Sequence, residues 1–442
     1  MNIETFKDEA ELKKCPIPFF DKFLRKTNDA SAFGFFRMGN GPVLMSNVYL
    51  SAALITLAEK EIDCYYADDD IEHDECGIVY GFKPSSLISN VGTISGILSA
   101  LLVPFIGAVI DCTDHRRRLG ILSALTLIVF QAVQIGTYQS TWFLMAILQA
   151  IKQCVYNVQT LAAYSYLPGI AKAVGQSTMI KYTADYSVAT FGMEAFYLVL
   201  CLGISIAMGL GDNNEATARL GQSVNVVVSG LLYYFSWYFF TSAPARRRLD
   251  EGESLVTAGF TQVFKTAKGI KKHYSSTLGY FLLAVVFSDA GHNAFSVVAV
   301  TYLAEVCHIG GQQLGIIFLL ILLSGVPGCY FAAWISNKTS PKTSIQIQLI
   351  SIISFNFLAF LTMTNPEPEF LPYLYGSIWG MLLGWFYPAE TAIFSMVQPK
   401  GQESELTGIF MYSAQILSWL PTLIFTIMNE SDIHMKWGGM FV

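Results

Sequence analysis

An acid and an imidazole stand in an otherwise apolar stretch of this chain, FSDAGHNAFSVVAV at residues 287–300. On a helix, Asp289 and His292 share one face with Asn293, because residues three and four positions apart are neighbours on the helix surface. Asp289 could take up a proton or accept the ammonium group of a solute, and His292 could tune it. Such a face has to point into the protein interior, because ionisable side chains are costly in lipid.

A second polar stripe lies within residues 141–166. Its members recur at helical spacing: Gln149, Lys152, Gln153, Tyr156, Asn157 and Thr160. We expect this stripe to face the bundle interior, where Lys152 would meet the carboxylate of a substrate across a cavity from Asp289. The alternative is an internal Lys152–Asp289 ion pair that only stabilises the bundle.

Other interior residues are weaker candidates. Tyr412 and Gln415 share a face with Trp419 and could line the same cavity, although aromatic residues at helical spacing more often pack. Glu194 and Glu390 also fall within apolar segments.

Long apolar helices are needed to position these side chains, and the composition of the chain is consistent with such helices. Of 442 residues, 53% are hydrophobic and only 14% are charged, which is typical of a chain that lies mostly in lipid. Nothing in the composition supports nucleic-acid binding. The polar opening, MNIETFKDEAELKK, lacks the apolar core of a cleavable signal peptide.

A membrane-spanning helix needs about 20 mainly apolar residues, and eleven segments of the sequence qualify. They lie at residues 42–58, 86–110, 119–138, 141–166, 183–210, 222–243, 277–303, 312–335, 344–363, 370–394 and 405–428. The long apolar runs lack the short alternating segments of a membrane barrel. The sequence therefore predicts an all-α polytopic membrane protein.

Most of the 27 Lys and Arg residues fall in the loops on the same side as the N-terminus, which predicts a cytosolic N-terminus. The acidic loop between the first two spans would then face the oxidising side. Cys64 and Cys76 flank this loop and could form a disulfide.

The predicted domain organisation has four parts: a cytosolic N-terminal segment at 1–41, a six-helix bundle at 42–243, a cytosolic linker at 244–276, and a second, incomplete bundle at 277–442. Apolar residues at helical spacing, with several lysines, predict an amphipathic helix in the linker, lying on the membrane surface. Eleven spans, with apolar character resuming at residues 437–442, suggest that a twelfth span is missing from this chain. The alternative is an eleven-helix protein whose C-terminus lies outside.

The loop GAVIDCTDHRRRLG, between the second and third spans, places Gly107 and Asp111 before Arg116 and Arg117. A carboxylate here could cap the next helix and pair with an arginine, forming a charge latch that gates one conformation. The alternative is a basic anchor at the membrane surface. The spacing resembles the loop signature of the major facilitator superfamily, with Cys112 and Asp114 as departures.

Further stretches resemble the vacuole-effluxer-like branch of that superfamily, the autophagy-related vacuolar amino-acid exporters. They are AFGFFRMGNGPVLMSNVYLSAALITLAE, AAYSYLPGIAK, LLAVVFSDAGHNAFSVVAVTYL and QPKGQESELTGIFMYSAQILSWL. The resemblance runs from about residue 31 to 430. It implies the major-facilitator fold and export of amino acids, neutral ones above all, from the vacuole into the cytosol by alternating access. The vacuolar membrane is the implied location, and proton coupling is an open possibility.

Two other interpretations stay open. One is a facilitator for another organic solute, such as a sugar, an organic ion or a metal chelate, and the other is a transporter-like membrane sensor. An enzyme is not expected, because the six histidines are dispersed and no paired catalytic groups stand near one membrane face. The sequence has no ATP-binding loop and no cysteine or histidine grouping at metal spacing, so we expect neither a cofactor nor a metal.

Overall fold

The computed structural model describes residues 24–441 apart from 63–76, 211–212, 243, 246–248, 250–253, 274–275, 367 and 398–402. The described chain is helical, with one isolated bridge between Val79 and Phe82. In chain order the helices are α1 Asn28–Glu61, η4 Pro84–Ser86, α2 Leu87–Cys112, α3 Arg116–Gln134, α4 Trp142–Tyr164, α5 Leu167–Val174, α6 Gln176–Ala207, α7 Asn214–Phe239, α8 Leu255–His273, α9 Ser276–Glu305, α10 Gly311–Lys338, α11 Pro341–Thr362, α12 Leu371–Val397, α13 Glu403–Ile416, α14 Trp419–Glu430 and α15 Met435–Phe441.

The first helix is much longer than predicted. The expected span, 42–58, is only the second part of α1, which begins at Asn28 with the Thr27 hydroxyl accepting from the Ala30 amide. The prediction stopped short because Arg37 and Asn40 lower the hydropathy of this stretch. These polar residues are nevertheless compatible with a helix here, because Phe33 and its aromatic neighbours bury the first turns in the core.

The last predicted span, 405–428, is broken into α13 and α14. Pro421 lacks the amide that would bond to the carbonyl of Leu417, which removes one helical hydrogen bond at this turn. The Leu420 amide instead bonds to the Leu417 carbonyl, in the tighter geometry of a helix end. In contrast, Pro104, Pro327 and Pro388 lie inside continuous helices.

Seven of the described helices are long and apolar enough to cross a membrane by themselves, so the predicted count of eleven is not confirmed. They lie in α1, the η4–α2 segment, α6, α9, α10, α11 and the α13–α14 segment. The others of similar length, α3, α4, α7 and α12, do not meet the same criterion. Polar residues such as Lys152 of α4 and Asn225 of α7 explain part of this result, since both are buried and do not face lipid.

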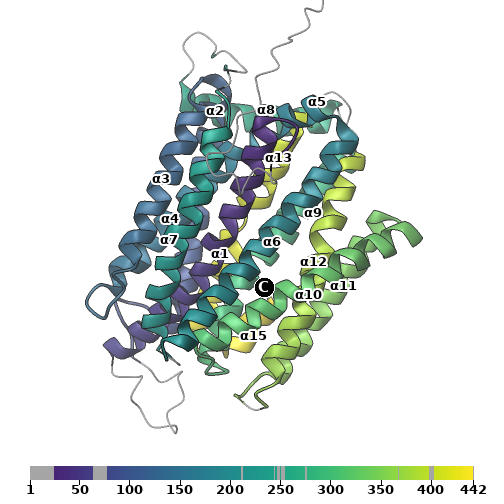
Figure 1. The fold of residues 1–442 in the computed structure, drawn as a ribbon. Helices are drawn as coiled ribbons and strands as arrows, with labels where there is room; N and C mark the ends of the chain where they lie inside the picture. Colours follow the sequence, from purple (N-terminus) through teal and green to yellow (C-terminus); the bar gives the residue numbers. More distant parts are fainter. Residues whose placement is uncertain are drawn as a thin grey trace, which may run out of the picture.

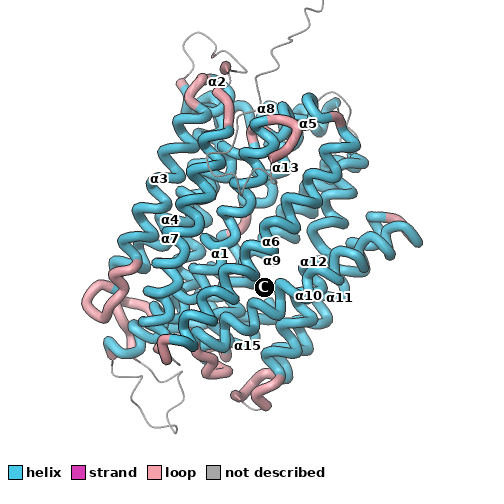
Figure 2. The backbone as a smooth tube through the Cα atoms, viewed as in Figure 1, coloured by secondary structure: helices cyan, strands magenta, loops and turns pink. Residues whose placement is uncertain are grey.

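The helices form an upright bundle, with the start of α1 at its upper end and the end of α1 at its lower end (Figure 1). Most of the described loops lie at the two ends of the bundle, as Figure 2 shows. Helices α1 to α7 pack mainly among themselves, and α9 to α15 do the same. We call these sets the first and the second helix group.

The predicted amphipathic helix of the linker is present as α8, which packs against α2. Gly259 makes this approach possible, because a Cβ atom there would lie 2.2 Å from the carbonyl oxygen of Pro104. The predicted position on a membrane surface remains a prediction.

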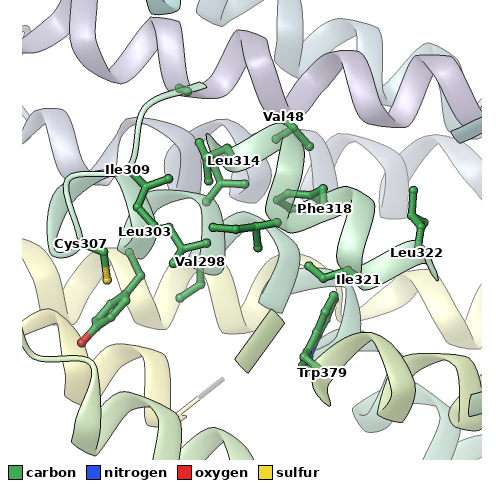
Figure 3. Packing of buried hydrophobic residues seen from close by; sticks show 14 of the residues in the cluster. Val48, Val298, Leu303, Cys307, Ile309, Leu314, Phe318, Ile321, Leu322 and Trp379 are labelled. Atoms are coloured by element: carbon green, nitrogen blue, oxygen red, sulfur yellow. The ribbon is translucent and has the colours of Figure 1, made fainter. Parts of the chain in front are cut away.

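The largest apolar core joins the two helix groups. It includes Val48 of α1, Val298 of α9, Leu314 and Phe318 of α10, and Trp379 of α12 (Figure 3). In a lipid bilayer such a core is stabilised by close van der Waals packing of its side chains, because lipid tails are as apolar as these residues. The core therefore packs α1 against α9, α10 and α12, and three of these helices, α1, α9 and α12, carry the polar residues of interest.

The lower end holds the two groups together through small polar residues of α2 and α14. The Ser89 and Thr426 hydroxyl oxygens are 2.7 Å apart, and the Thr93 hydroxyl donates to that of Thr422 at 3.0 Å. Gly96 lets Trp419 approach, since a Cβ atom there would lie 2.7 Å from the Trp419 Cβ. Close packing over small residues is the usual way in which membrane helices associate. We call this contact the hydroxyl seam.

Candidate functional site

Helix α9 carries the predicted pair into the interior. Asp289 and His292 are each 8% exposed, and the ring of His292 stacks on Phe386 of α12 with 3.8 Å between ring centroids. The His292 Nδ1 atom lies 2.8 Å from the carbonyl oxygen of Ser288, on its own helix. This arrangement leaves Nε2 to face the interior.

Glu390 of α12 joins this pair one turn beyond Phe386. It is 4% exposed, and its carboxyl interacts electrostatically with that of Asp289. Three buried atoms of the group have no protein hydrogen-bond partner: Asp289 Oδ1, His292 Nε2 and Glu390 Oε1. Buried polar atoms normally have partners, so these three favour a bound solute, proton or water. We call Asp289, His292 and Glu390 the acidic cluster.

A complementary cluster lies in the first helix group around Arg37 of α1, which is half-buried. Its Nη1 atom donates to the Tyr164 hydroxyl of α4 at 2.9 Å. The guanidinium also interacts electrostatically with Tyr156 and with Glu194 of α6. Arg37 forms no ion pair within the described residues, so most of its five N–H donors remain available to a solute.

Glu194 is held near Arg37 by a close approach of α1 and α6. A Cβ atom on Gly41 would lie 2.9 Å from Glu194 Cγ and 3.0 Å from its backbone nitrogen. One turn earlier, the Thr190 hydroxyl donates to the carbonyl of Arg37 at 3.2 Å. Glycine at position 41 thus brings this carboxyl, 4% exposed, beside α1.

Tyr387 of α12 connects the two clusters. It interacts electrostatically with Asp289 and Glu390 on one side and with Arg37 and Glu194 on the other. Tyr387 itself is 43% exposed. The structure thus brings a cation of the first helix group and acids of the second close to one tyrosine.

Lys152 does not reach this position. It is 1% exposed and its ammonium donates to Gln134 Oε1 of α3 at 2.7 Å. The alternative of a Lys152–Asp289 ion pair is wrong for this conformation, because no such pair occurs among the described residues. Helical spacing correctly predicted a buried lysine, but the side chain points toward α3.

The other polar residues of the stripe on α4 contact different neighbouring helices. Gln149 donates to the Ser51 hydroxyl of α1 at 3.1 Å, and Asn157 donates to the Ser99 hydroxyl of α2 at 2.8 Å. Gln153 is half-buried. Gln149 and Asn157 therefore join helices within the first group, and Tyr156 is the stripe residue that reaches the Arg37 cluster.

Asn293 lies farther along α9, where its amide approaches the Ala414 carbonyl of α13 at 3.5 Å. Tyr412 and Gln415, also on α13, are half-buried. Asn293 is one turn from Asp289 but exposed, so it does not share the burial predicted for this face of α9.

In the predicted gating loop, Arg117 donates to the carbonyl of Trp237 through Nε and Nη2, at 3.3 and 3.1 Å. Arg116 is buried, with its guanidinium 5.3 Å from the ring centroid of Tyr166, and Asp111 is exposed. Gly107 borders open space, since a Cβ atom added there would have no described neighbour within 4 Å. Arg117 thus joins α3 to α7 within the first group, and a latch between groups remains a prediction. Cys64 and Cys76 lie outside the described residues.

Sequence reasoning missed Arg37, Tyr164, Phe386 and Tyr387 as site residues. Arg37 had a usable signal, an arginine amid aromatic residues and glycines, but it lay before the predicted span. Tyr387 and Phe386 had none, because aromatic residues are common throughout this chain.

Comparison with known proteins gives consistent results. A family model described as vacuole effluxer Atg22 like matches residues 26–441. The human organic anion transporter MFSD10 is similar in structure, with a TM-score of 0.58 at 13% identity, covering 94% of this chain and 97% of that one. The xylose transporter XylE from E. coli, in an inward-open conformation, has a TM-score of 0.56 at 13% identity and 93% coverage of both chains.

A transporter of the POT family, in complex with a thioalcohol-conjugated peptide, is also similar, with a TM-score of 0.59 at 12% identity and 93% coverage of both chains. At these identities the likeness concerns the fold alone. It is the fold of transporters that move small molecules across membranes.

Proposed function

The chain belongs to the vacuole effluxer Atg22-like family of major-facilitator membrane transporters, and on this premise we propose that it moves neutral amino acids from a vacuole or comparable store into the cytosol. Transport would proceed by alternating access between the two helix groups. The upper end of the bundle would face the cytosol, because most basic loop residues lie there.

The observation that carries this proposal is the separation of charge around Tyr387. Arg37 offers N–H donors that suit a carboxylate, and Asp289 and Glu390 offer acceptors that suit an ammonium group. A zwitterion could be bound by both at once. A neutral sugar would use neither charge fully, which favours an amino acid over that alternative.

The site also explains how binding could couple to movement. Arg37 lies on α1 of the first group, whereas the acidic cluster lies on α9 and α12 of the second. A ligand that binds both clusters favours the conformation in which they are close together. Proton uptake by the acidic cluster would be a second way to neutralise its charge.

The test is efflux of a labelled amino-acid mixture from proteoliposomes that hold the protein, with and without a pH gradient. We expect gradient-dependent efflux by the wild type and its loss in Asp289→Asn, which keeps the shape of the side chain but removes its charge. Glu61→Gln is the matched control, because Glu61 is an exposed acid near the lower end of the same molecule.

Efflux that Asp289→Asn leaves unchanged would give that acid a structural role only. If a folded wild type moves no amino acid, the substrate assignment is wrong. A competition panel of sugars, organic ions and metal chelates would then separate another transporter from a membrane sensor.

A further inference from the structure

A buried cation that pairs with no carboxylate of the described chain lies inside the first helix group. Lys152 of α4 is 1% exposed, and its ammonium donates to the uncharged Gln134 Oε1 atom of α3 at 2.7 Å. Helices α3 and α4 are described in full and contain no Asp or Glu residue. A buried charge is costly unless an opposite charge lies beside it. The counter-ion of this lysine therefore does not come from the two helices that surround its ammonium.

Gln131 of α3 is a second polar side chain of this interior. It is 0% exposed, and neither its amide nitrogen nor its amide oxygen has a hydrogen-bond partner among the described residues. Buried polar atoms normally have partners, because an unpaired donor or acceptor in the interior costs free energy. An amide with none therefore indicates a position where a further group binds.

The packing of α3 against α4 brings Gln131 to the lysine. The two helices are antiparallel and joined by the short segment 135–141, and the Gln134 amide donates to the Met145 carbonyl of α4 at 3.4 Å. Gln131 is one turn before Gln134 on the same side of α3. In an antiparallel pair, residues before Gln134 lie level with residues after Met145. Gln131 is thus between the backbone of Lys152 and the amide that its ammonium reaches.

Gln149 closes this interior toward α1. It is one turn before Lys152 on α4 and donates to the Ser51 hydroxyl of α1 at 3.1 Å. Gln149 and Ser51 are 6% and 5% exposed, so water and lipid are largely excluded here as well. Helices α1, α3 and α4 therefore enclose the ammonium of Lys152 and the amide of Gln131.

The N–H groups that lack a described partner at this position outnumber the oxygens that lack one. Lys152 has three N–H donors, of which one bonds to Gln134, and both N–H donors of the Gln131 amide have no described partner. The corresponding oxygens are Gln131 Oε1 and Gln149 Oε1. An anion accepts from several N–H groups at once and also offsets the buried charge, whereas a water molecule offsets none.

We propose that Lys152 and Gln131 bind a small inorganic anion such as chloride, which is enclosed between α1, α3 and α4 as the counter-ion of the lysine. A spherical ion accepts N–H groups from any direction, and these side chains are too deeply buried for a larger solute to reach them without separating the helices. The inference does not depend on the transported substrate. All residues of this anion site belong to the first helix group, apart from the acidic cluster of the second.

The test measures thermal unfolding of the full chain in detergent without substrate, followed by tryptophan fluorescence. Chloride replaces gluconate at constant ionic strength, so that screening of surface charges stays the same. For the wild type we expect the melting temperature to rise and then saturate with chloride, because a ligand of the folded state stabilises it in proportion to its binding. We expect no such rise in Lys152→Met. Lys172→Met removes an exposed lysine of α5 in the same helix group and should keep the wild-type response.

Two substitutions of Gln131 keep the lysine and separate the possible causes. Gln131→Leu removes one ligand of the anion, so we expect the half-saturating chloride concentration to rise several-fold. Gln131→Glu supplies a tethered counter-ion for Lys152. Without chloride it should melt at a higher temperature than the wild type, and chloride should no longer change its melting temperature.

A wild-type melting temperature that is the same in chloride and gluconate would overturn the proposal, as expected for an uncharged amine. A chloride response that persists unchanged in both Lys152→Met and Gln131→Leu would also overturn it, because the ion would then bind elsewhere. Stabilisation by acetate but not by chloride would show a carboxylate site instead. If Lys152→Met elutes as an aggregate, the two Gln131 variants decide. Because no substrate is present, these outcomes are independent of whether amino acids are transported.

Discussion

At the scale of single residues, Arg37 is the group on which binding of a substrate carboxylate would depend. Arg37→Lys keeps the positive charge but replaces a planar fork by a point charge, and it loses the geometry of the bond to Tyr164. We expect KM for an amino acid to rise roughly tenfold, equivalent to about 1.4 kcal/mol. Initial rates of uptake or efflux over a range of concentrations provide the measurement.

Tyr164→Phe serves as the control for that experiment, because it removes the bond to Arg37 while leaving the guanidinium in place. A KM that stays within twofold of wild type in Arg37→Lys would exclude bidentate recognition by Arg37.

For Lys152 we expect an effect on stability and none on substrate binding. Lys152→Met leaves Gln134 Oε1 without its donor in a buried position, which should lower the free energy of unfolding by roughly 1–3 kcal/mol. We expect KM to change little, since Lys152 is bonded to α3 and not to the site. Thermal unfolding and transport kinetics of the same preparation separate the two effects. A large rise in KM with unchanged stability would restore the role first predicted for this lysine.

Lys152 and Arg37 together show which features of a side chain helical spacing predicts and which it does not. The spacing of Asp289 and His292 correctly indicated a buried polar face, because exposure to lipid is costly on any side of the bundle. It could not indicate which neighbouring helix a long side chain would reach. Lys152 bonds to α3 and Arg37 extends to α4 because of how the helices are rotated about their axes, which a single sequence does not specify.

At the scale of elements, Gly120 determines how closely α3 packs against α7. A Cβ atom at this position would lie 1.8 Å from the ring of Trp237, which no ordinary rearrangement of the ring edge can accommodate. We expect Gly120→Ala to lower the free energy of unfolding by about 1–3 kcal/mol, as overpacking does elsewhere. Thermal unfolding in detergent is the measurement.

Gly203→Ala on α6 is the matched control, since nothing lies within 4 Å of its would-be Cβ atom among the described residues. There alanine should be neutral or slightly stabilising, because glycine is the poorer helix former by up to about 1 kcal/mol. Equal effects of the two substitutions would show that the α3–α7 contact is less tight than the structure indicates.

The sequence predicted the position and length of a helix well wherever its apolar residues form a continuous run. The first and last residues of α2, α9 and α10 lie within a few residues of the ends of the predicted spans. The start of α1 was not predicted, because it depends on neighbours: aromatic packing supports its polar first turns. The break between α13 and α14 lies just before Pro421 and has a local cause in that proline, which has no amide hydrogen to donate.

At the scale of the whole molecule, alternating access predicts that the hydroxyl seam must open during each transport cycle. Cysteines at Ser89 and Thr426 should form a disulfide, because the two hydroxyl oxygens are only 2.7 Å apart. We expect oxidation of Ser89→Cys/Thr426→Cys to abolish transport and a reductant to restore it. Each single cysteine variant, oxidised in the same way, is the control.

Full transport by the cross-linked protein would mean that the lower end does not open along this seam. Transport lost in the single variants as well would point to a native cysteine.

The hydroxyl seam has a further consequence for the energy of turnover. The Thr93 hydroxyl can donate either to Thr422 or to the carbonyl of Ser89 on its own helix, and the Ser89 and Thr422 hydroxyls also have carbonyl partners within their own helices. When the helices separate, these hydroxyls rotate toward those carbonyls and no donor is left unsatisfied. An apolar seam would instead expose its full area to water at every opening. The chemistry of serine and threonine thus makes the contact easy to break and remake many times, so that separating α2 from α14 need not limit the rate of the cycle.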